Sequence, residues 1–126
     1  MKLADMNPNT GLVHRKVGRS LMVGKWQIID GVDEASKCTY RRIFHHSTLM
    51  GEWYKFGEIE VTAPDEDDDF VIEADTEFHF APMSTGWGSV SDQQGMNRML
   101  AGTGWRFVRS GGVPRYVHEN GRQFPH

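Results

Sequence analysis

Cysteine is almost absent from this sequence, and its scarcity removes several classes of protein at once. Cys38 is the only cysteine, which excludes an internal disulfide and a cluster of thiolates around a metal ion within one chain. A lone thiol is typical of a reducing compartment, so a cytoplasmic protein is expected. No stretch approaches the roughly 18 apolar residues of a membrane-spanning helix, and the N-terminus has no apolar run of secretory length. A soluble protein without a membrane partner is therefore predicted.

An excess of positive charge is missing as well. The formal net charge is −3, whereas proteins that bind a nucleic-acid polymer generally carry a basic surface. Long helix-forming stretches rich in Ala, Leu, Glu and Lys are also missing, while glycine is frequent at 14 of 126 residues. This balance favours strands and turns over helices, and a chain of this length buries one core.

Alternating apolar and polar residues predict antiparallel strands along most of the chain. We expect them over residues 20–30, 38–46, 52–62 and 70–82, and as a hairpin over 105–118. Gly24 is interpreted as a bulge within the first strand. The Ser-Gly-Gly sequence in the middle of 105–118 is the turn of the hairpin.

The hydrophobic period changes from two to 3.6 after residue 90, which predicts one short helix. Ser91 is expected to cap its N-terminus, with Gln94 completing a capping box. Met96, Met99 and Leu100 then form an apolar stripe at helical spacing.

These elements predict an α+β domain over residues 19–126, an antiparallel β-sheet with one short helix packed on a face and a C-terminal β-hairpin. Residues 1–18 show no periodicity and are interpreted as an irregular N-terminal arm.

The sequence around the helix start contains the strongest candidate for a binding site. Trp87 lies between two glycines, so its ring has little steric cover and can serve as a platform for a nucleobase. A helix start at Ser91 presents backbone N–H groups to an anion, and Asp92 can complement that end or accept a ribose hydroxyl. Asn97 can pair with the edge of a base.

Arginines of the closing hairpin and of the 38–46 strand complete this candidate site, because guanidinium groups bind phosphates in a bidentate manner. The candidate ligand-binding residues are Trp87, Ser91, Asp92, Asn97, Arg109, Arg115, Arg41 and Arg42. Together they predict a site for a nucleotide that carries a pyrophosphate. The competing interpretation is that Trp87 fills a small core and the arginines are solvated.

A metal site is the first alternative. His45, His46 and His79 could ligate zinc, but adjacent histidines on a strand point to opposite faces. No metal and no cofactor is therefore predicted.

Two further functions stay open. No serine or cysteine has the setting of an activated nucleophile, so no catalytic residue is assigned, but a nucleotide-cleaving enzyme could use His46 or His79 as a general acid or base. The five consecutive acidic residues 65–69 indicate a solvated loop, or alternatively the contact surface of an acidic protein-protein inhibitor of a host defence protein.

Three stretches, FHHSTLM, GWGSVSDQQGMNRML and GWRFVRSGG, together resemble small phage-encoded proteins, in particular the Thoeris anti-defence sponges that sequester cyclic ADP-ribose signals. The resemblance covers residues 40–118 and is strongest over 83–100. It implies a non-catalytic homo-oligomer, a dimer or dimer-based assembly, that binds a glycocyclic ADP-ribose signal in a pocket between two subunits. Such a protein acts in the cytoplasm of the infected bacterium, and family members are also associated with cyclic oligonucleotides at separate sites.

The resemblance also implies roles for individual residues. Trp87 would stack on adenine, and Asn97 would read the base or ribose. Arg109 and Arg115 would bind phosphate, and Arg15 or Arg19 would come from the partner subunit.

Overall fold

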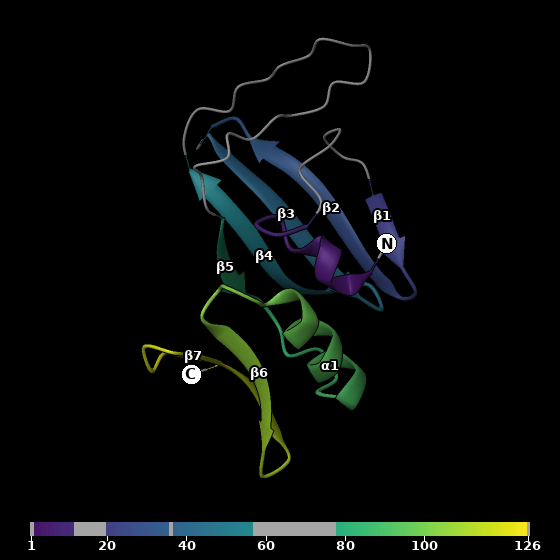
Figure 1. The fold of residues 1–126 in the computed structure, drawn as a ribbon, viewed down its shortest axis with the longest axis vertical. Helices are drawn as coiled ribbons and strands as arrows, with labels where there is room; N and C mark the ends of the chain where they lie inside the picture. The colour runs from purple at the N-terminus through teal and green to yellow at the C-terminus, as the bar shows by residue number, and fades with distance from the viewer. Residues whose placement is uncertain (1, 12–19, 36, 57–77, 126) are drawn as a thin grey trace.

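The computed structural model describes residues 2–11, 20–35, 37–56 and 78–125, which form two antiparallel sheets and one α-helix (Figure 1). The first sheet contains β1 (Ser20–Val23), β2 (Trp26–Asp33), β3 (Cys38–His45), β4 (Thr48–Phe56) and β5 (His79–Pro82) in chain order. After α1 (Val90–Met99), the second sheet contains β6 (Trp105–Ser110), β7 (Val113–His118) and β8 (Gln123–Phe124). A short 3-10 helix, η1 (Leu3–Met6), precedes β1. The predicted α+β composition, mostly antiparallel strands with one helix, is confirmed.

The predicted single strand over residues 20–30 is wrong, because these residues form two strands joined by a tight turn. Val23 pairs with Trp26, so only Gly24 and Lys25 lie between β1 and β2. Gly24 has a φ of 58°, a left-handed conformation that glycine adopts without steric cost and that matches the twist of a two-residue hairpin.

The predicted closing hairpin is present as β6 and β7, which are joined by Gly111 and Gly112. The short β8 adds a third strand beside β7 that the sequence pattern did not predict. The hairpin is therefore part of a small sheet of its own.

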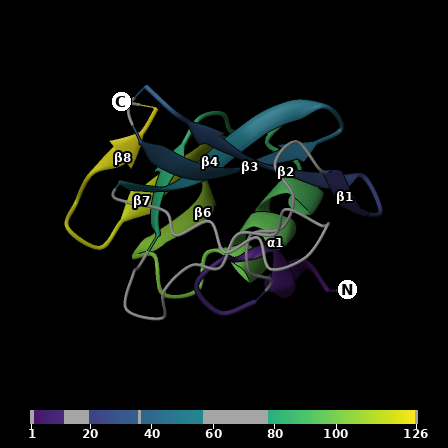
Figure 2. The same cartoon turned by 90° about the horizontal axis from the view of Figure 1, so that it is seen from above.

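One hydrophobic core joins the two sheets and the helix, and Figure 2 shows α1 and β6 beneath the five-stranded sheet. Its fully buried members come from all three layers: Ile28, Ile43, Met50, Trp53, Met96, Met99, Phe107 and Tyr116. The Tyr116 hydroxyl donates to the carbonyl of Ser84, 2.8 Å away, which ties β7 to the segment that follows β5. The predicted apolar stripe of Met96, Met99 and Leu100 lies in this core.

The N-terminal residues also belong to the core, although an irregular arm was expected for 1–18. Met6 and Asn7 are buried. The Asn7 amide donates to the carbonyls of Met99 and Ala101, each at 2.9 Å. Polar side chains that bond distant backbone groups leave no trace in hydropathy, so the pattern did not reveal this packing.

Several expectations concern residues outside the described ranges. They are the strand ends at 57–62 and 70–77, the acidic residues 65–69, and Arg15 and Arg19. Within the described ranges, no helix has the length and apolar character needed to span a membrane.

Candidate functional site

The helix start differs from the prediction by two residues. Ser89, not Ser91, is the N-cap of α1, and its hydroxyl accepts from the backbone N–H of Asp92 at 3.0 Å. The Asp92 carboxylate in turn accepts from the backbone N–H of Ser89, which completes a capping box. The sequence contains two overlapping Ser-x-x-acid/amide patterns, and the one whose third position is a carboxylate forms the cap.

Asp92 occupies the position where an anion was expected to bind. Its Oδ2 accepts from the backbone N–H of Trp87 at 3.1 Å as well as from Ser89, and its Oδ1 lies 2.5 Å from Nδ1 of His45. Burial raises the pKa of Asp92, but hydrogen bonds from His45 and Ser89 outweigh this effect and hold the pKa below its ordinary value. The helix start is therefore already complemented by its own carboxylate, which is one of the two roles predicted for Asp92, and anion binding at Ser91 stays a prediction.

Asn97 and Arg41 also have structural partners rather than a free polar end. The Asn97 amide donates to the carbonyl of Phe107 at 2.9 Å and accepts from its N–H at 2.8 Å, which links α1 to β6. Arg41 is fully buried and donates to both carboxylate oxygens of Asp30, at 2.7 and 2.9 Å, and to the carbonyl of Met6. Both side chains thus have a structural role in this fold, and their predicted roles in reading a base and binding phosphate stay predictions.

The remaining arginines lie nearer to solvent. Arg42 pairs with Glu52 at 3.0 Å and lies over the ring of Tyr40. Arg115 donates to the side chain of Gln123 at 2.8 Å. Arg109 is exposed on β6.

Trp87 is 85% exposed, so the interpretation that it fills a small core is wrong. Gly88 packs on Pro114, which is the strand partner of Arg109. The structure therefore brings Trp87 and Arg109 to the same corner of the molecule. This corner is an open surface.

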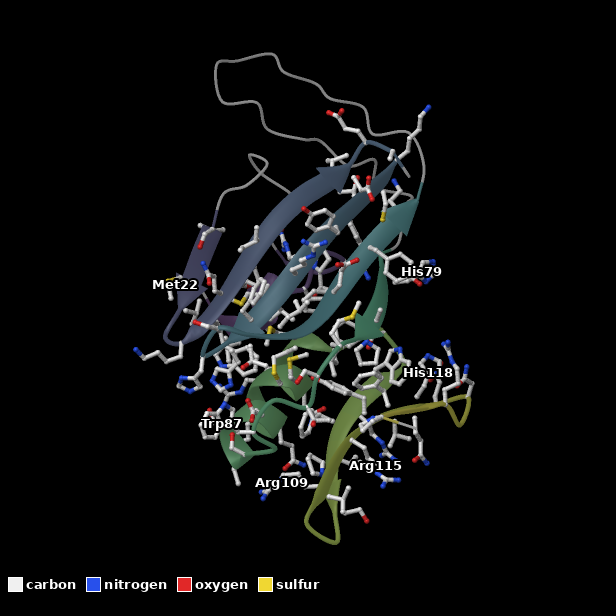
Figure 3. All side chains as sticks on the ribbon, turned by 180° about the vertical axis from the view of Figure 1, so that it is seen from behind. Met22, His79, Trp87, Arg109, Arg115 and His118 are labelled. Carbon is white, nitrogen blue, oxygen red and sulfur yellow. The ribbon has the colours of Figure 1, made fainter. Side chains whose placement is uncertain are left out.

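A partly open pocket lies elsewhere, between the edge of the large sheet and the small sheet, and we call it the inter-sheet pocket. It has a volume of about 330 Å³. The pocket is lined by Tyr54, Phe78, His79, Phe80, Ala81, Pro82, Gly102, Thr103, Trp105, His118, Arg122, Gln123 and Phe124. Figure 3 shows His79 and His118 on one side of the molecule and Trp87 on the other, so the two candidate regions are separate.

The lining of the inter-sheet pocket combines aromatic rings with basic side chains. The Arg122 guanidinium lies 5.4 Å from the centre of the Trp105 ring, and the His118 ring meets Trp105 edge-on at 4.9 Å. His79 lies against Tyr54 on neighbouring strands, with ring centres 5.9 Å apart. None of the described residues that line the pocket is acidic. Such a lining suits a ligand with a planar ring and a negative charge.

His118 is held in one orientation by its own turn. Its Nδ1 accepts from the backbone N–H of Asn120 at 3.1 Å, which leaves the proton of the neutral ring on Nε2. Nε2 lies beside Gly104, where an added Cβ would approach it to 2.7 Å. Glycine at this position leaves room beside Nε2, and the carboxylate of Glu119 lies near the same point, with Oε1 3.2 Å from the added Cβ.

Sequence reasoning missed this pocket because its lining comes from separated segments around residues 54, 78–82, 102–105 and 118–124. No spacing rule connects them, since they meet only when the two sheets share a core. His79 was considered alone, as a zinc ligand or a general acid or base. Within the described part of the chain, no group of three or more His, Cys, Asp or Glu side chains is placed to hold a metal ion.

Comparison of the chain with protein-family models, with curated proteins and with solved structures found no match.

Proposed function

We propose that this protein binds a cyclic nucleotide immune signal in the inter-sheet pocket and withholds it without cleaving it, thereby inhibiting bacterial anti-phage defence. One observation carries the proposal: in a chain with a net charge of −3, this pocket combines Arg122, Trp105 and two histidines and has no acidic residue among its described lining. A nucleotide offers the complementary groups, a planar base and an anionic phosphate.

The chemistry of the pocket agrees with such a ligand. A base stacked on an aromatic side chain contributes about 1–3 kcal/mol, and hydrogen bonds from a charged guanidinium to phosphate are among the stronger ones in proteins. The volume of about 330 Å³ lies at the lower end of the roughly 300–1,000 Å³ usual for small-molecule sites. It therefore suits one nucleotide unit of a compact signal better than an extended oligonucleotide.

The resemblance of residues 40–118 to the Thoeris anti-defence sponges supports the signal class and the absence of turnover. A sponge acts stoichiometrically in the cytoplasm of the infected bacterium, so its affinity must be high. A Kd of about 1 nM corresponds to about −12 kcal/mol, which a stacked base and several charge-assisted hydrogen bonds can supply after association costs. Assembly into a homo-oligomer is part of the same proposal.

The proposal is tested by identifying what the purified protein retains. The protein is mixed with cyclic ADP-ribose isomers and with cyclic di- and trinucleotides, separated from free ligand and heated, and the released compound is identified by mass. Intact nucleotide released only by denaturation supports a sponge and names its ligand. If the folded protein retains no member of the panel, the proposed function is wrong.

A nucleotide-cleaving enzyme is the second candidate, because His79 and His118 both line the inter-sheet pocket. Two histidines on one ligand can act as general base and general acid in phosphodiester cleavage. The same experiment separates the candidates, since an enzyme returns a product of different mass and releases it without heating.

A further inference from the structure

We infer that the inter-sheet pocket contains a phosphate subsite formed by the backbone of Gly102 and the side chains of His118 and Arg122. The inference deepens the proposed function, because it states which end of the pocket takes the anionic part of the nucleotide. The ligand class for the subsite itself is a phosphate or pyrophosphate group, so it can be tested without any nucleotide.

The turn between β7 and β8 brings the two side chains of the subsite together. The backbone N–H of His118 donates to the carbonyl of Arg122 at 2.8 Å, and the N–H of Gly121 donates back to the carbonyl of His118 at 2.9 Å. The side chain of Asn120 accepts from the N–H of Arg122 at 2.9 Å. His118 and Arg122 are thus fixed at the base of one tight turn, and both contact the ring of Trp105.

Each of these side chains presents a donor that remains available. The proton on Nε2 of His118 follows from the bond that Nδ1 accepts, and Gly104 places no side chain against that proton. Arg122 is exposed, and its guanidinium lies over the ring of Trp105, with Cζ 5.4 Å from the ring centre. Among the described residues, no acid forms an ion pair with either side chain.

Gly102 adds a backbone donor at the wall of the pocket. It has a φ of 78°, and no atom lies within 4 Å of the position that a Cβ would take. The neighbouring N–H of Thr103 is used, since it donates to Leu100, but within the described ranges nothing accepts from the N–H of Gly102. A glycine with open space at its Cβ position beside a pocket allows a phosphate oxygen to approach the backbone closely.

One negative charge near the subsite, that of Glu119, repels an anion, and removing it gives a variant that tests the subsite. The carboxylate of Glu119 also lies beside Gly104, with Oε1 3.2 Å from the same added Cβ position that Nε2 of His118 approaches to 2.7 Å. Removing this charge strengthens binding of an anion in the subsite through weaker repulsion and has no such effect on an anion bound elsewhere. Glu119→Gln is thus expected to bind phosphate about twofold or more tightly.

The test uses the full chain titrated with inorganic pyrophosphate and followed by the amide signals in NMR spectra. We expect the signals of Gly102, His118 and Arg122 to shift together. Arg122→Gln and His118→Gln each weaken binding about tenfold, the usual effect of losing a hydrogen bond to a charged group. Arg109→Gln is the matched control, because it removes the same charge from an exposed arginine of β6 and should leave the affinity unchanged.

Two outcomes would overturn the subsite. Equal loss in Arg109→Gln and Arg122→Gln would mean that pyrophosphate follows the overall charge, and signals that shift around Trp87 instead would place the anion at the other corner. The proposed function fails separately, when pyrophosphate binds as described but no nucleotide is retained. If the nucleotide is retained and its affinity is unchanged in His118→Gln and Arg122→Gln, the subsite is wrong but the proposed function stands.

Discussion

Asp92 is a buried carboxylate whose two oxygens contact different parts of the chain. Oδ1 meets His45 at the end of β3, and Oδ2 holds the loop from Trp87 to Ser89 at the start of α1. The His45 ring is stacked face to face on Trp26 at 3.9 Å, so the histidine cannot turn away without exposing that indole. A single side chain thus joins the large sheet, the Trp87 loop and the helix.

Replacing Asp92 with Ala is expected to destabilise the protein by about 3–5 kcal/mol, because it removes a buried carboxylate and leaves His45 and the backbone N–H groups of Trp87 and Ser89 without their partner. The pKa of Asp92 is lowered in the folded protein, so its ionised form is the one that stabilises the fold. That contribution is fully present above the ordinary carboxyl pKa of about 4 and is lost as the pH falls through the lower folded value. Urea midpoints at pH 7 and pH 3 measure it.

Asp92→Asn serves as the control for that measurement, because asparagine keeps the shape of the side chain but has no carboxyl group that can titrate. Its urea midpoint should depend less on pH than that of the wild type. Equal pH dependence in both proteins would show that other carboxyl groups dominate acid unfolding.

Two tryptophans distinguish the two candidate regions. Trp105→Leu removes an aromatic platform from the inter-sheet pocket while keeping apolar volume, and we expect it to weaken nucleotide binding by about 1–3 kcal/mol. Trp87→Leu is the matched substitution on the exposed corner and should change neither the affinity nor the thermal midpoint. Calorimetric titration with the retained nucleotide measures both affinities. If the substitution at Trp87 weakens binding and Trp105→Leu does not, the nucleotide binds at the Trp87 corner instead.

At the scale of elements, the contact between α1 and the large sheet depends on a helical glycine. A Cβ added at Gly95 would lie 2.1 Å from the ring of Trp26, and that ring is itself held by the stacked His45. Close approach at this point therefore requires a residue without a side chain.

Gly95→Ala is consequently expected to destabilise the fold by about 1–3 kcal/mol through overpacking, although alanine is the better helix former by about 1 kcal/mol. Gln94 lies on the exposed face of the same helix, so Gln94→Ala changes only the helix propensity and causes no overpacking. It should be neutral or slightly stabilising. Thermal midpoints of both variants test the difference. A stabilised Gly95→Ala would mean that the Trp26 ring moves aside at little cost.

The elements were predictable where one local signal decided them. Alternation identified β3, Ser-Gly-Gly identified the β6–β7 turn, and Met96 and Met99 identified the buried face of α1. The turn at Gly24 was missed because apolar residues flank it on both sides, so the pattern continues without a break. The N-cap of α1 was predicted two residues too late because Ser89 and Ser91 each begin a capping pattern. Which serine forms the cap depends on Asp92, and Asp92 contacts His45, which is 47 positions away in the sequence.

The candidate site was less predictable than the fold, for a reason that Asn97 illustrates. The residue type was correctly read as a hydrogen-bonding amide, but its partner is the backbone of Phe107 rather than a ligand. Arg41 likewise uses its donors on Asp30 and Met6. Sequence gives the chemistry of a side chain, whereas its availability depends on what the fold places beside it.

At the scale of the whole molecule, the inter-sheet pocket depends on the two sheets keeping one relative position. Its walls come from β4 and β5 on one side and from the segments around Trp105 and Arg122 on the other. The shared core provides this alignment, because Phe107 and Tyr116 of the small sheet pack in the same cluster as Met50 and Trp53. We therefore expect the two sheets to unfold as one cooperative unit.

Cys38 allows this cooperativity to be measured, because it is a buried free thiol on β3 of the large sheet. Phe107→Leu changes a residue of the small sheet on its side of the shared core and should destabilise the protein by roughly 1–2 kcal/mol. In moderate urea, where global opening dominates, labelling of Cys38 should then accelerate about fivefold to thirtyfold, the factor that corresponds to this free energy. If the labelling rate of Cys38 is unchanged while the unfolding midpoint of the small sheet falls, the two sheets open independently. The inter-sheet pocket would then lose one of its walls before the large sheet unfolds.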